Sequence, residues 1–141
     1  MRDALAVLHR IRKHRKKGAE KEFMSAERKR QAQEARVEAI AETVARSRDT
    51  DQADDEAGWV AQAQAWRLKM EVALRRERGR LTEATQEASR RQSHLAVATR
   101  QARVVEKVIE KIDDRAVEVE RRREARRLDD MGTSRWRRED G

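Results

Sequence analysis

The histidines are the side chains of this sequence best suited to bind a metal ion or to move a proton, and their spacing favours neither role. His9 and His14 are five residues apart, which places them about 140° apart around a helix, and His94 lies far along the chain. No carboxylate or second histidine stands three or four residues from any of them to complete a ligand set. The sequence has no cysteine, which excludes disulfides, thiolate catalysis and cysteine-based zinc sites. We therefore expect no metal site.

The hydroxyl and carboxyl groups show no catalytic arrangement either. No arrangement of a histidine together with an aspartate lies near any of the serines, which are Ser25, Ser47, Ser89, Ser93 and Ser134. The carboxylates lie among arginines and lysines at helical spacing, which is typical of surface ion pairs between residues i and i+4. The sequence also lacks a glycine-rich phosphate loop. We expect no enzyme activity, no cofactor and no small-molecule substrate, and we predict a protein that binds other proteins.

The composition indicates long helices rather than a compact core. Of the 141 residues 44% are charged and only 3% are aromatic, and proline is absent. Such usage is typical of coiled coils, and the lack of proline allows helices to run uninterrupted. No apolar run approaches the roughly 18 residues of a membrane span. The N-terminal sequence has too short an apolar stretch for a secretory signal, so the cytoplasm is the expected location.

A seven-residue repeat, with positions a to g, runs through the second half of the chain. With Leu81 at position a, the a and d positions from Val60 to Val119 are mostly apolar, and only three of these 18 positions are charged. The charged ones are Arg67, Glu77 and Arg91. A repeat sustained in one register predicts a long coiled-coil helix over about residues 58–136.

The first half carries a second apolar series, which predicts a helix over about residues 2–47. Its members alternate in steps of four and three: Ala19, Phe23, Ala26, Arg30, Gln33, Val37, Ile40 and Val44. Leu5, Leu8 and Ile11 extend it after an expected register slip near residues 12–18. Two such helices would each bury an apolar stripe by packing against the other.

The segment between the two helices, about residues 48–57, is the expected turn. It has no apolar periodicity, is rich in acidic residues and is followed by Gly58. The predicted fold is therefore all-α, a long antiparallel two-helix coiled-coil hairpin that occupies residues 1–141 as one domain. A turn near residue 70 would give arms of equal length, but it would break the heptad where the repeat is regular.

The two helices differ in length, so part of the second is expected to lack a partner within the chain. Folding near residue 53 pairs Val44 with residues 60–63 and Phe23 with residues 81–84, so that Leu5 reaches only to about residue 101. The stretch from Val105 to Met131 then has no helix beside it. An apolar stripe of that length favours a partner protein.

The net charge of +8 is distributed unevenly. Residues 10–17 hold six lysines or arginines, and residues 121–138 hold eight arginines against three acids. The hairpin is expected to bring these basic segments to one end. The acidic residues of the turn, at the other end, are Asp49, Asp51, Asp54, Asp55 and Glu56. Such polarity would orient the protein in the field of a charged partner.

Two alternatives fit the same composition. Arginine-rich helices bind phosphates without sequence preference, but acids are interleaved here and no aromatic stacking platform is present, so nucleic acid is not the expected partner. A homo-oligomeric structural coiled coil is the other alternative. Trp59 and Trp66 both fall at position g, where they could pack at the edge of the interface or anchor a partner, and Trp136 lies in the arginine-rich tail.

Two segments of the sequence resemble the flagellar export protein family FliJ and the related stalk proteins of type III secretion of the YscO kind. One is the C-terminal stretch of residues 106–136, with its charged helix followed by Leu128, Asp129, Asp130 and Met131. The other is the tryptophan-bearing start of the second helix, residues 58–74, which follows a polar turn.

The resemblance implies a non-enzymatic stalk that binds and stimulates a hexameric export ATPase, contacts the membrane protein of the export gate and escorts substrate chaperones. It would lie at the cytoplasmic face of the inner membrane. The residues that the resemblance and the basic segments assign to the ATPase ring are Arg10, Arg12, Lys13, Arg121, Arg122, Arg123, Arg126, Arg127, Leu128 and Met131. Those that the resemblance assigns to the export gate are Ile40, Val44, Trp66, Met70 and Ala73.

Overall fold

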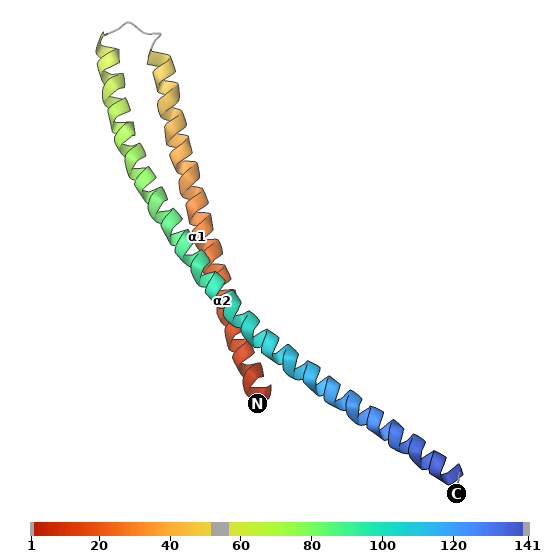
Figure 1. The fold of residues 1–141 in the computed structure, drawn as a ribbon. Coiled ribbons are helices and arrows are strands. Elements are labelled where there is room, and N and C mark those ends of the chain that lie inside the picture. Colours follow the sequence, from red (N-terminus) through yellow and green to blue (C-terminus); the bar gives the residue numbers. More distant parts are fainter. Residues whose placement is uncertain (1, 52–56, 140–141) are drawn as a thin grey trace. The chain divides into compact units, whose positions relative to one another are not determined.

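The structure, a computed structural model, describes residues 2–51 and 57–139, which form two long α-helices. Helix α1 runs Arg2–Asp51 and helix α2 runs Ala57–Glu139 (Figure 1). The two helices pack against each other antiparallel, so the predicted all-α two-helix hairpin is confirmed. The alternative prediction of a turn near residue 70 is wrong, because that position lies inside α2. Of the predicted acidic turn, residues 52–56 lie outside the described residues, and only the helical backbone of Asp49 and Asp51 is described.

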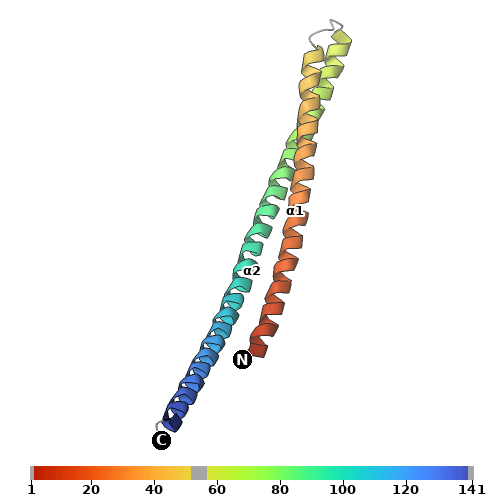
Figure 2. The ribbon, with the colours of Figure 1, turned by 90° about the vertical axis from the view of Figure 1, so that its right-hand side faces the viewer.

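The contacts between the helices divide the chain into two units. Unit 2 comprises Arg15–Ala98, and there α1 lies beside α2 in both views of the ribbon (Figures 1 and 2). Two ion pairs join its helices: Arg48 Nη2 lies 3.1 Å from Glu71 Oε1, and Arg91 Nη1 lies 2.9 Å from Glu22 Oε2. The residue earlier in α1 pairs with the residue later in α2, as antiparallel helices require.

Unit 1 comprises Met1–His14 and Thr99–Gly141, and its helices also run antiparallel. Arg12 Nη1 donates a hydrogen bond of 3.0 Å to the backbone oxygen of Gln101. Near the start of α1, Arg2 Nη2 lies 3.0 Å from Asp113 Oδ1. The interface of this unit holds the most buried side chain described, that of Val105, which is 3% exposed.

The heptad of α2 is confirmed by burial over most of its length. Every a and d side chain from Ala63 to Ile112 is buried or half-buried, including the charged positions Arg67, Glu77 and Arg91. The repeat therefore faces α1 in a single register over seven heptads. Its last two members, Ala116 and Val119, are exposed.

The interface of α1 also follows one register, and the slip expected near residues 12–18 is wrong. The buried and half-buried series from Ala19 to Val44 continues towards the N-terminus through Lys16, Arg12, His9 and Leu5 in unbroken steps of three and four. Long basic side chains can hold such positions because their methylene stems cover apolar surface while the charge reaches water. Leu8 and Ile11, which were expected in the interface, are instead 36% and 44% exposed.

The pairing of the helices differs from the predicted pairing by about one heptad. Phe23 was expected opposite residues 81–84, whereas its neighbour Glu22 pairs with Arg91. A shift of seven residues leaves both apolar stripes facing each other, so the apolar pattern alone does not select between these registers. Charge selects the observed register: the predicted register would place Arg91 near Lys16, whereas the observed register places it beside Glu22.

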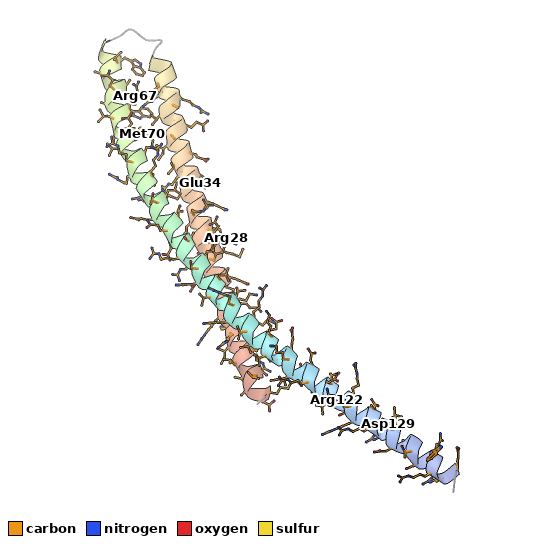
Figure 3. The ribbon with its side chains drawn as sticks, viewed as in Figure 1. Arg28, Glu34, Arg67, Met70, Arg122 and Asp129 are labelled. Atoms are coloured by element: carbon orange, nitrogen blue, oxygen red, sulfur yellow. The ribbon has the colours of Figure 1, made fainter. Side chains whose placement is uncertain are left out.

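The unpaired part of α2 is consequently shorter than predicted. Val105 was expected to lack a partner but is buried, and Ile109 and Ile112 are half-buried. Beyond Asp113 every described side chain is exposed, from residue 114 to residue 139. We call residues 114–139 the C-terminal segment; Figure 3 labels Arg122 and Asp129 on it.

Two polar residues at interface positions of unit 2 bind each other across the helices. The side-chain amide of Gln33 donates hydrogen bonds to the carboxylate of Glu77 and, at 3.0 Å, to the backbone oxygen of Glu77. The hydrogen bond from Gln33 holds the pKa of Glu77 below its ordinary 4.5, and the positive charges of Arg80 and Arg36 add to this effect. Both residues lie at d positions of the interface, where each satisfies the polar groups of the other.

A network of ion pairs within α1 surrounds Arg30, a charged residue at an interface position. Arg30 lies at 2.6 Å from Glu27 Oε1 and at 2.9 Å from Glu34 Oε2. The hydrogen bond from Arg30 lowers the pKa of Glu27, and that of Arg30 is raised by the same contact. The cation is therefore neutralised where it borders the apolar stripe.

Replacing Gln33 with Leu should raise the pKa of Glu77 towards its ordinary value. A carboxylate with a lowered pKa stabilises the fold above the pKa of the unfolded chain, and this contribution is lost as pH falls through the folded pKa. The stability difference between wild type and Gln33→Leu should therefore shrink below about pH 4.5. Carbon-13 NMR titration of the glutamates and urea unfolding across pH measure both effects. Gln31→Leu, at an exposed position, is the control; an unchanged Glu77 pKa in Gln33→Leu would contradict the assignment.

Replacing His9 with Leu should stabilise the hairpin. His9 occupies an interface position, and its buried Nδ1 has no hydrogen-bond partner among the described residues. An unsatisfied buried polar atom costs free energy that leucine does not, so we expect the free energy of unfolding to rise by about 1 kcal/mol. Chemical denaturation followed by circular dichroism measures it. His14→Leu, at an exposed site, should change little, and equal effects of the two substitutions would argue against the interface position of His9.

Deleting residues 116–141 should leave the paired helices intact. No described side chain beyond Asp113 is buried, so the deletion is expected to change the free energy of unfolding by less than about 0.5 kcal/mol. Deleting residues 102–141 instead removes Ala102 and Val105 and should destabilise the protein by several times as much. Urea unfolding of the two truncated chains compares them. A large loss in the shorter deletion would show that the C-terminal segment packs on the hairpin.

Candidate protein-binding surfaces

The described residues offer surfaces rather than a pocket for chemistry. Among them no group of histidine, aspartate and glutamate side chains is arranged to hold a metal ion. Neither helix, over its described length, has a stretch apolar enough to cross a membrane. The features that could bind a partner are exposed charged and apolar side chains along the two helices.

The C-terminal segment presents the greatest density of exposed arginine. Arg121, Arg122 and Arg123 follow one another in its middle, and all three are exposed. Arg122 Nε lies 3.4 Å from Glu118 Oε1 one turn earlier, a solvent-exposed ion pair of little energetic weight. The guanidinium groups along this helix are therefore presented to solvent.

An apolar strip accompanies these arginines. Leu128 and Met131 are three residues apart, so they share one side of α2, and they are 66% and 61% exposed. Five of the ten residues that line a shallow depression around them are basic, and one, Asp130, is acidic; the basic ones are Arg123, Arg126, Arg127, Arg135 and Arg138. Trp136, 65% exposed, lies one turn further on. Five of the seven predicted ring-binding residues of α2 line or border this depression, namely Arg123, Arg126, Arg127, Leu128 and Met131. Arg121 and Arg122 are exposed on the same segment but do not line it.

The predicted ring-binding residues of α1 lie elsewhere. Arg12 is half-buried and bonds to Gln101, whereas Arg10 and Lys13 are exposed beside the same part of α2. Arg121 follows Gln101 by twenty residues, a separation of about 30 Å along a helix. The expectation that both basic segments share one end is therefore wrong, because α2 continues well past the N-terminal end of α1.

The residues that resemblance assigned to the export gate lie together in unit 2. Ile40, Val44, Met70 and Ala73 face the interface between α1 and α2 and are buried or half-buried, with Val44 only 6% exposed. Met70 is labelled on α2 in Figure 3. Trp66, 40% exposed, is the one member of the set at the surface. The other four side chains pack between the two helices and are therefore less available to a partner protein than Trp66.

Other exposed apolar side chains were not singled out from the sequence. Leu68 and Val72 are 66% and 47% exposed on the outer side of α2 in unit 2. In unit 1, Val104 and Val108 are 57% and 39% exposed. All four stand outside the a and d positions, and an apolar residue at such a position is the signal that could have identified them.

Comparisons with known proteins identify the family of the chain. A family model described as the flagellar FliJ protein matches residues 1–141, the whole chain. Nothing matches it among curated proteins or solved structures. FliJ proteins are non-enzymatic components of flagellar export. The chain belongs to the FliJ family of flagellar proteins and is thereby a protein related to flagellar export.

Proposed function

We propose that this protein is a stalk of the flagellar export apparatus that binds its hexameric ATPase through the C-terminal segment and stimulates ATP hydrolysis. The observation that supports this most directly is the exposure of every described side chain in residues 114–139. A helix without an intramolecular partner gains most of its stability by packing on another protein. The protein would act at the cytoplasmic face of the inner membrane.

The dimensions and charge of the C-terminal segment suit the central opening of a ring. One helix with its side chains is about 10–12 Å across, much narrower than a helix pair. Arginine presents a planar fork that pairs with carboxylates in two hydrogen bonds, so arginines on several sides can meet acidic side chains of several subunits. Leu128 and Met131 would supply apolar contacts. Arg10 and Lys13, on α1, lie beside a part of α2 near Gln101, too far from Leu128 and Met131 to share those contacts, and would bind a different part of the ATPase.

The other partners implied by the family are assigned less directly. Contact with the membrane protein of the export gate would centre on Trp66, because Ile40, Val44, Met70 and Ala73 already contribute to the hairpin interface. Substrate chaperones would bind a surface that these two contacts leave open. The protein would carry out no chemistry of its own and would work by changing how the ATPase subunits assemble.

Reversing the charge of Arg122, Arg123 and Arg126 together should abolish stimulation of ATP hydrolysis while leaving helicity unchanged. All three are exposed, and the ion pair of Arg122 with Glu118 lies within one turn of α2, so the pairing of α1 with α2 does not depend on them. Phosphate release by the purified export ATPase, with increasing amounts of each variant, measures stimulation, and far-ultraviolet circular dichroism measures helicity.

The matched control reverses Arg28, Arg90 and Arg103, which are also exposed and lie outside the C-terminal segment. Arg90 pairs with Glu87 as Arg122 pairs with Glu118, so the loss of a surface ion pair is matched as well. The control should stimulate like the wild type. Full stimulation by the first variant, or equal loss in both, would reject the C-terminal segment as the ATPase contact.

A further inference from the structure

One side of unit 1 carries apolar side chains that the hairpin does not cover. Leu8 and Ile11 on α1 are 36% and 44% exposed, and Val104 and Val108 on α2 are 57% and 39% exposed. We call these four residues the side patch. Within each helix the two members are three or four residues apart, so they lie on one face of that helix.

The heptad positions place both pairs on the same side of the helix pair. With His9 at position a, Leu8 is at g and Ile11 at c; on α2, Val108 is at g and Val104 at c. In antiparallel coiled coils the g positions of the two helices flank the same side of the interface. Unit 2 shows this arrangement directly, because Glu22 and Glu87, both at g, line one shallow depression.

The opposite side of the same segments is polar. Positions b and e of α1 there hold Arg10 and Lys13, and those of α2 hold Glu106, Glu110 and Asp113. The side patch thus has no apolar counterpart at the positions of Arg10, Lys13, Glu106 and Glu110. Val7 and Val117, two other exposed valines of unit 1, are at positions f and b and so stand apart from its g and c positions. An apolar patch of this kind, in a chain that is 44% charged, indicates a contact surface.

The border of the side patch on α2 is basic. Lys107, Lys111 and Arg115, at positions f, c and g, are all exposed next to Val104 and Val108. One acid, Asp114 at position f, accompanies them, whereas the other acids of this stretch lie on the opposite side. A partner that covers the valines would therefore bring its own flanking groups close to three cations.

We propose that the side patch binds one amphipathic helix of a partner protein, whose apolar stripe is flanked by glutamate or aspartate. The side chains of two antiparallel helices form a groove that accepts the ridge of a third helix, as in helical bundles. A second copy of this chain is disfavoured because its patch would bring like charges together. The inference does not depend on the proposed function, since the four residues of the side patch lie outside residues 114–139, of which only Asp114 and Arg115 border the patch, and outside the side that holds Arg10 and Lys13.

The proposal predicts binding of a defined probe. The probe is a designed 21-residue amphipathic peptide with leucine and isoleucine at its a and d positions and glutamate on both flanks, and its matched control has lysine on both flanks. Fluorescence anisotropy with the labelled peptides and the full-length chain should show the glutamate peptide binding at least tenfold more tightly than the lysine peptide.

Variants of the chain locate the site. Ile11→Asp combined with Val104→Asp should weaken binding of the glutamate peptide at least tenfold. Val117→Asp, at another exposed valine of unit 1, should bind like the wild type. Lys111→Glu with Arg115→Glu keeps the apolar contacts and should reverse the preference, so that the lysine peptide binds more tightly. Circular dichroism confirms that each variant keeps its helicity.

Several outcomes would overturn the proposal. Absence of binding, equal affinity for both peptides, or binding unaffected by Ile11→Asp with Val104→Asp would each do so. Light scattering that shows a dimer of the wild-type chain but a monomer of that variant would make the patch a self-association surface. Association with vesicles of anionic lipid that the same variant abolishes would make it a membrane-binding surface.

Discussion

The fold depends on the burial of one apolar stripe of α1 against one apolar stripe of α2. Neither helix has another partner within the described chain, and a helix in water gains most of its stability from packing. Only six side chains of the described residues are buried, each less than a tenth exposed, namely Ala26, Val37, Val44, Ala88, Ala102 and Val105. These are small residues, which let the helices approach closely but leave a thin core. The alignment of the two stripes decides which side chains of each helix are covered and which remain exposed.

Polar side chains at interface positions select one alignment of the two stripes. The apolar stripes repeat every seven residues and would match equally well after a shift of one heptad. The contact of Arg91 with Glu22 belongs to the observed register, because a shift of one heptad would place Arg91 near Lys16. Charged residues in the interface thus lower the density of apolar contacts and in return select one pairing, a role for which buried polar residues in coiled coils are well attested.

The unequal length of the helices determines what is left for partners. Pairing ends at Arg2 and Asp113, and α2 continues to Glu139 with exposed arginines and apolar residues. Within the paired region, side chains assigned to a partner by resemblance, such as Val44, are occupied by the hairpin, while Trp66 remains at its edge. Surfaces that the interface leaves uncovered, including Leu8 and Val108, are therefore the ones available for recognition.

The sequence by itself determined the helical class, the heptad of α2 and the presence of a second helix, because a period of seven can be recognised without knowledge of the partner. It also located the arginine-rich segment that ends the chain. Only the tertiary structure decided which heptads face each other, that His9, Arg12 and Lys16 continue the interface of α1, and that Leu8 and Ile11 lie outside it. Apolar periodicity does not decide these points, because it is unchanged by a seven-residue shift. It also does not identify interface positions that are filled by the methylene stems of basic side chains.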